Sequence, residues 1–197
     1  MSDTQNRSTQ QIEIYSSPAR KFHWVMAFLL LLQVPLGLAM VYRGVDLGIF
    51  DSVTNHMYTS HKLIGVVLLV LIIFRFLYRL MNGAPEEPDT LEPWQKKLSM
   101  LNHWGIYVLL IAVPILGYLG TAYYGALNIW GLFKLPAVVG VDKEVAKVVL
   151  AYHAWAAFAL LALVVLHIVA AIYHHRIRKD LVLARMLPRL LKNSDKA

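Results

Sequence analysis

The stretch VVLAYHAWAAFALLALVVLHIVAAIY, residues 148–173, has no charged side chain, but it contains two histidines, His153 and His167. A run of about 20 predominantly apolar residues is long enough to cross a bilayer as a helix. At about 1.5 Å and 100° per residue, the histidines lie roughly 21 Å apart along the axis and only about 40° apart around it. Two imidazoles therefore share one face near opposite sides of a membrane, a costly arrangement unless something binds them.

Three further segments have the length and composition of membrane spans: residues 22–42, 61–81 and 103–124. Hydrophobic residues make up 58% of the 197 residues and charged residues only 16%, with a mean hydropathy of +0.53. A soluble domain of this size would need more polar surface. We therefore expect a single membrane domain of the all-α class, a four-helix transmembrane bundle in contact with the lipid bilayer.

The basic residues follow the membrane pattern, so the net charge of +7 does not indicate a nucleic-acid partner. Fourteen of the 19 Lys and Arg residues lie on the side that carries both termini. The positive-inside rule therefore predicts that both termini are cytoplasmic. The polar residues 1–19 contain no apolar core of a signal peptide, so the first span is expected to be retained.

Two segments outside the spans carry their own expectations. The outer connection 125–147 contains NIWGLF at 128–133, an aromatic, amphipathic stretch expected at the membrane interface. The basic tail 174–197 has apolar residues at 181, 183, 186 and 187, and is expected to lie on the inner surface as an amphipathic helix.

Four histidines fall at two depths in the predicted bundle. His23 opens the first span at the inner depth and His61 opens the second at the outer depth, whereas His153 is outer and His167 inner. Depth then pairs His61 with His153 and His23 with His167. One histidine in an apolar helix can simply hydrogen-bond a neighbour, but four at matched depths predict two haem groups, each held between two imidazoles. Such iron has no open position, which suits electron transfer, and the absence of cysteine excludes covalent haem attachment.

Small residues on the same faces would leave room for a flat macrocycle, although they also let helices pack closely. They are Gly37, Gly65, Ala156, Ala157 and Ala171.

Arg75 lies fourteen residues after His61 and so points into the bundle near the inner depth. A guanidinium there is costly unless paired, and a haem propionate would pair with it bidentately. The alternative is that Arg75 and Arg79 both extend to the inner surface.

Four other histidines are less specific. His56 is expected in an outer loop, exposed to water. His103 opens the third span, where a simple interfacial histidine is favoured over one that lines a quinone pocket or contacts a propionate. His174 and His175 end the fourth helix, where a cationic side chain suits the helix dipole.

At these residues the chain resembles the bacterial cytochrome b561 family of di-haem inner-membrane proteins, over roughly residues 15–190. The matching pieces are Phe22-His23-Trp24, Ser60-His61-Lys62, Ile64-Gly65, His103 to Pro114, Tyr152-His153, Leu166-His167, His174-His175, and the tail from Lys179-Asp180 to Pro188. The resemblance implies haem b ligation by His23, His61, His153 and His167. It also implies exchange of electrons with membrane quinone, and some members resemble superoxide-to-ubiquinone oxidoreductases.

The expected function is transfer of electrons between an outer one-electron donor, superoxide or a periplasmic redox protein, and quinone. Lys62, beside His61, is the candidate catalytic residue, because positive charge would attract an anionic donor to the haem edge. An alternative with the same chemistry is the cytochrome b anchor subunit of a periplasmic dehydrogenase or hydrogenase. A histidine-lined metal or proton transporter is the alternative from another class, but the spans lack the intramembrane Asp and Glu of an ion path.

Overall fold

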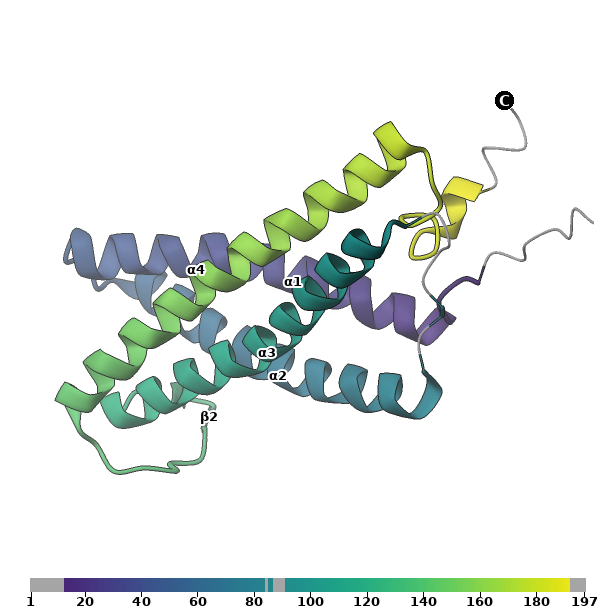
Figure 1. Cartoon of the computed structure of the whole chain (residues 1–197). Coiled ribbons are helices and arrows are strands. Elements are labelled where there is room, and N and C mark those ends of the chain that lie inside the picture. Colours follow the sequence, from purple (N-terminus) through teal and green to yellow (C-terminus); the bar gives the residue numbers. More distant parts are fainter. Residues whose placement is uncertain (1–12, 84, 87–90, 192–197) are drawn as a thin grey trace, which may run out of the picture.

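The computed structural model describes residues 13–83, 85–86 and 91–191, and its framework is four long helices (Figure 1). Helix α1 comprises Ser17–Val41 and continues as a π-helix, η1, over Tyr42–Asp46. The others are α2 (Ser52–Asn82), α3 (Pro93–Tyr124) and α4 (Lys143–Tyr173), which continues as the π-helix η2 (His174–Arg178). All four are long and apolar enough to cross a membrane, and each expected span lies inside one of them, so the predicted fold class is confirmed.

The helices begin several residues before the apolar runs because their caps lie in the polar connections. Ser16, Asp51 and Asp142 each accept a hydrogen bond from a backbone N–H of the first turn that follows. Glu92 and Gln95 form a reciprocal capping box at the start of α3. One consequence corrects the sequence-based expectation for His56, which lies in the first turns of α2 and not in a loop, although its side chain is exposed.

The helices pack in the order of the chain: α1 on α2, α2 on α3, and α3 on α4. A small core of Met26, Leu68 and Ile72 lies where α1 meets α2. The α3–α4 contact is close, because a Cβ added at Gly120 would lie 2.6 Å from Cδ2 of Leu150. Most other large apolar side chains on the helices are exposed, as expected for a bundle surrounded by lipid.

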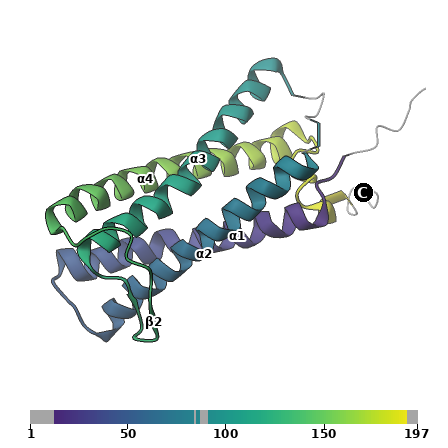
Figure 2. The ribbon, with the colours of Figure 1, turned by 90° about the horizontal axis from the view of Figure 1, so that it is seen from below.

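The bundle has two distinct ends. Helix α1 begins and α4 ends at the same end, which we call the termini end, and β1 (Asn128–Ile129) and β2 (Phe133–Lys134) lie at the opposite, hairpin end (Figures 1 and 2). The aromatic stretch 128–133 thus folds as a two-stranded antiparallel hairpin. Its turn uses positive φ values at Trp130 and Gly131, and Leu132 is 78% exposed.

The predicted amphipathic helix in the tail is wrong. After η2 the chain leaves helical geometry at Lys179, whose φ is 53°, and then forms turns up to a short 3-10 helix, η3 (Pro188–Leu190). Ala184 and Arg185 are buried there because the tail packs against the start of the chain. Residues 192–197 of the expected tail, like residues 1–12, lie outside the described part.

Candidate functional site

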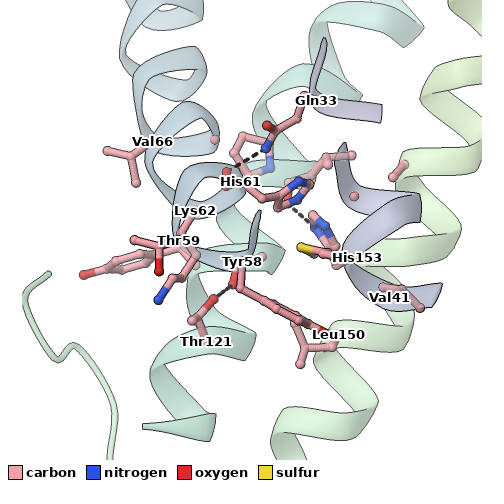
Figure 3. Close-up of a pocket in the computed structure, with 18 of the residues that line it drawn as sticks. Gln33, Val41, Tyr58, Thr59, His61, Lys62, Val66, Thr121, Leu150 and His153 are labelled. Atoms are coloured by element: carbon pink, nitrogen blue, oxygen red, sulfur yellow. Dashed lines mark hydrogen bonds between the residues drawn. The ribbon is translucent and has the colours of Figure 1, made fainter. Parts of the chain in front are cut away.

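Two histidines face each other toward the hairpin end of the bundle. His61 comes from α2 and His153 from α4, and in Figure 3 their rings point toward one another. The ring centroids are 6.1 Å apart and the planes are inclined by 88°. We call His61 and His153 the hairpin-end pair. The same two histidines were paired in the sequence analysis from their expected depth in the membrane.

The two rings of the hairpin-end pair are held differently. Nδ1 of His153 lies 2.8 Å from the carbonyl oxygen of Val113, which can only accept, so Nδ1 carries the proton and Nε2 keeps a lone pair. Such a hydrogen bond is the usual support of a metal-ligating imidazole. Nδ1 of His61 is buried and has no hydrogen-bond partner among the described residues, while Gln33 donates to the backbone carbonyl of His61 at 2.7 Å.

Two glycines make room for these rings. A Cβ added at Gly37 would lie 3.0 Å from Cε1 of His61, and one added at Gly117 would lie 3.0 Å from both Cε1 and Nδ1 of His153. Gly65, which the sequence had placed beside Gly37 in this role, would bring its Cβ only to 3.5 Å from Gln33. Gly117 was missed, since nothing in the sequence showed which face of α3 meets α4.

The hairpin-end pair opens into a cavity of about 1590 Å³. Residues of all four helices and of the hairpin connection line it, including Val34, Leu68, Pro114, Leu161 and Leu135. Ligand sites of drug-sized molecules usually measure about 300–1,000 Å³. The space between the helices is therefore large and mostly apolar, and the two imidazoles are among the polar groups that line it.

Lys62 lies at the edge of this cavity and is engaged with the chain itself. Its Nζ donates to the backbone carbonyls of Ala126 and Asn128, each at 2.8 Å. A positive charge is thus fixed one residue from His61 and also holds the connection between α3 and the hairpin.

The second pair lies toward the termini end. The rings of His23 on α1 and His167 on α4 have centroids 6.3 Å apart and planes inclined by 67°. His103 adds a third imidazole, with its centroid 5.2 Å from that of His167. Nδ1 of His103 donates to the carbonyl of Ser99 at 2.7 Å. The sequence had favoured a simple interfacial role for His103, whereas the structure places it half-buried against this termini-end pair.

Arg75 is half-buried and bonds within the protein. Its Nη1 donates to the carbonyl of Ala19 at 2.9 Å, and its Nε lies 3.3 Å from the hydroxyl of Tyr107. It is close enough to His23 and His167 to act on them electrostatically. Arg79 is exposed and stacks its guanidinium 5.7 Å from the centre of the Tyr107 ring.

The remaining histidines take no part in either pair. Nδ1 of His56 lies 2.6 Å from the carbonyl of Ser52, one turn earlier in α2. His174 contacts the carboxylate of Asp180 at 2.5 Å, so a specific partner adds to the helix-end position expected from the sequence. His175 lies beside it in η2.

Four membrane-length helices that hold facing imidazoles at two levels define a class of protein, a membrane-embedded helical bundle with paired histidines in its interior. The family model described as prokaryotic cytochrome b561 matches residues 14–189. The chain therefore belongs to the prokaryotic cytochrome b561 family.

Several curated relatives are similar to this chain over most of their lengths. Cytochrome b561 homolog 2 of Escherichia coli (strain K12) is 32% identical over 180 residues, which is 91% of this chain and 94% of the relative. The Yersinia pestis protein named "Probable superoxide oxidase CybB" is 29% identical over 179 residues, which is 89% of this chain and 96% of the relative. Cytochrome b562 of Cereibacter sphaeroides is 29% identical over 167 residues, covering 84% and 89%. The chain is thus a multi-pass bacterial membrane protein that binds b-type haem and transfers electrons.

Proposed function

We propose that this chain is a di-haem cytochrome that passes electrons between a one-electron donor outside the membrane and the membrane quinone pool. The observation that carries the proposal is the presence of two facing imidazole pairs, each with one member on α4: His153 faces His61 of α2, and His167 faces His23 of α1. Fourteen residues of helix separate the two levels by roughly 21 Å, most of the ~30 Å hydrocarbon core.

The residues present fit haem at the hairpin-end pair. The two ring centroids are 6.1 Å apart across a large apolar cavity, and Gly37 and Gly117 leave the rings uncrowded. In the part of the chain that the structure describes, Nδ1 of His61 is buried and has no hydrogen-bond partner, as is found in sites that a bound ligand completes. His61 and His153 would hold a haem b there, and the haem would supply a one-electron redox centre.

At the termini-end pair the chain supplies charge as well as ligands. We assign His23 and His167 as the axial pair, and Arg75 as the partner of a haem propionate. Arg75 is half-buried and lies near both histidines, and a guanidinium is the side chain best matched to a carboxylate. His103 is then the neighbouring imidazole that completes the polar surroundings of this level.

The distribution of basic residues indicates which end of the bundle receives the electron donor. The excess of basic residues beside the termini indicates that the hairpin end faces outward. There Lys62 holds a positive charge next to His61 at the edge of the cavity. We propose that it attracts an anionic donor, superoxide, toward this level, consistent with the name of the Yersinia pestis relative.

Stopped-flow mixing of the purified protein with superoxide and with quinol, in separate experiments, tests this function. We expect both reagents to reduce the haem, and the Soret and alpha absorption bands of b-type haem report this reduction. Absence of any reaction with superoxide would show that the donor is something else, and absence of reaction with quinol would remove the quinone link.

A second candidate, the anchor subunit of a periplasmic dehydrogenase or hydrogenase, is favoured by the exposed hairpin. Leu132, Phe133 and Val138 expose apolar surface at the end that would face a periplasmic partner. Purification separates the two functions. A stand-alone carrier is monodisperse and redox-active without a partner, whereas an anchor subunit copurifies with its catalytic subunit.

A further inference from the structure

The C-terminal segment 179–187, which we call the strap, connects α1 and α4, two helices that make few direct contacts with each other. Helices α1 and α4 are both described in full and have no packing comparable to the α1–α2 or α3–α4 contact. Yet His23 and His167, which face each other, belong to these two helices. The strap leaves the end of α4 and returns to the beginning of α1, so it bridges the gap at the termini end.

Arg185 fastens the strap to two other segments. Its Nε donates to the carbonyl of Glu13 at 2.9 Å, and its Nη2 donates to the carbonyl of Glu86 at 2.6 Å. Its guanidinium lies over the ring of Tyr15, 5.7 Å from the centre, and its own carbonyl accepts from the N–H of Tyr15. Arg185 is only 7% exposed. One side chain thus joins the strap, the residues before α1 and the connection that follows α2.

Two more contacts lead from the strap to the histidine helices. The indole N–H of Trp24 donates to the carbonyl of Met186 at 3.1 Å, and the ring of Trp24 lies 5.1 Å from that of His23. At the other end, Asp180 contacts His174 at the end of α4, and both side chains are largely buried. The strap is therefore attached to the first turns of α1 on one side and to the end of α4 on the other.

We propose that the strap sets the spacing and orientation of His23 relative to His167, and that Arg185 is the positioning residue that holds the strap in place. The part that concerns haem rests on the proposed function above, whereas the part that concerns the helices does not. Arginine suits this role because its planar fork donates in two directions at once. A lysine ammonium keeps the charge but lacks the fork that reaches both carbonyls.

The test compares Arg185→Lys and Arg185→Gln with the control Arg189→Gln. The control removes one positive charge, as Arg185→Gln does, but from an exposed position four residues later. The first measurement is hydrogen exchange of the backbone amides of 181–187 in the full-length protein. We expect exchange to rise roughly tenfold in both Arg185 variants, the equivalent of one lost hydrogen bond from a charged donor. Arg189→Gln should match wild type. Unchanged exchange in Arg185→Lys would overturn the assignment, because charge alone would then hold the strap.

The second measurement reports on the helices without relying on haem. Since the sequence has no cysteine, spin labels can be placed specifically at Lys21→Cys on α1 and Arg176→Cys in η2, both exposed. We expect the distance distribution between the labels to broaden when Arg185→Lys is added. A distribution identical to that of the labelled parent would overturn the positioning role, even if the strap exchanges faster.

The third measurement addresses the histidine pair itself. The low-spin ferric EPR signal depends on the angle between two axial imidazole planes, so the signal of one haem should change in Arg185→Lys and in Trp24→Phe. The signal of the other haem, between His61 and His153, should stay the same. Two unchanged signals would overturn the link from the strap to His23. A wild-type protein without haem would instead contradict the proposed function, and the exchange and distance results would still decide the role of Arg185.

Discussion

The hairpin-end pair and the termini-end pair each consist of two histidines, but the surroundings of the two pairs differ. His61 and His153 face a cavity of about 1590 Å³ with glycines against their rings. His23 and His167 lie among a third imidazole and the guanidinium of Arg75, beneath the strap. When ligands are identical, nearby charge, hydrogen bonding and burial set the difference in redox potential. The comparison therefore predicts two spectroscopically and electrochemically distinct haems.

The largest expected effect is loss of one haem at a time. His61→Ala should remove the haem of the hairpin-end pair and leave the other, and His23→Ala should do the reverse. The pyridine haemochrome assay should then give half the wild-type haem per polypeptide for each variant. A wild type with about one haem per chain, or single variants that lose all haem, would contradict two independent sites.

Crowding a ring should have a smaller effect, confined to one level. In Gly117→Ala the new Cβ would lie 3.0 Å from the His153 ring, so the ring must shift, at a cost of about 1–3 kcal/mol in haem binding. Gly65→Ala is the matched control, because its nearest neighbour is 3.5 Å away. Haem content after gel filtration measures the difference. Equal retention by the two variants would show that Gly117 does not shape the site.

Arg75 offers a test of charge at the termini-end pair. Arg75→Leu should lower the midpoint potential of that haem, because a nearby cation stabilises the reduced iron electrostatically. Arg79→Leu removes the same charge from an exposed position one turn later on α2 and should have much less effect. Spectroelectrochemical titration resolves the two haems. A titration curve unchanged in Arg75→Leu would leave this arginine with only its bonds to Ala19 and Tyr107.

Lys62 tests whether the hairpin end receives an anion. Lys62→Glu should slow reduction by superoxide roughly tenfold at low ionic strength, and the deficit should shrink as salt screens the field. Reduction by quinol should hardly change. Lys134→Glu makes the same charge change on the exposed hairpin and should have a weaker effect. If Lys62→Glu keeps the wild-type rate at low salt, Lys62 serves only to hold the carbonyls of Ala126 and Asn128.

The sequence predicted the features that follow from helical periodicity and hydropathy. The four spans lie inside the observed helices, and pairing by depth brought together His61 with His153 and His23 with His167. Both results depend only on the rise and turn of a helix and on the direction in which each helix crosses the membrane. They need no knowledge of which helix packs on which.

Features that depend on contacts between distant segments were missed. Gly117 and His103 lie on α3, and only its rotation against α4 shows that they meet His153 and His167. Arg185 reads as one more basic residue of an amphipathic tail, because its acceptors are the carbonyls of Glu13 and Glu86. Every residue has a backbone carbonyl, so the sequence does not show which carbonyl will accept a hydrogen bond, and such partners can be found only in the fold.

The smallest expected effect concerns acid and Asp51, the residue that caps the start of α2, ten residues before His61 of the hairpin-end pair. The backbone N–H and the hydroxyl of Thr54, and then Arg43, hydrogen-bond the carboxylate of Asp51 and hold its pKa below the ordinary value. A lowered pKa means that the charged form stabilises the folded state. That contribution is present above the ordinary pKa of about 4 and is lost as the pH falls through the lowered value.

Asp51→Asn keeps an oxygen that can cap the helix but does not titrate. The thermal midpoint of wild type should therefore exceed that of Asp51→Asn slightly at neutral pH, and the gap should close below about pH 4. A gap between the two midpoints that does not change with pH would show that Asp51 acts through its shape as a cap and not through its charge.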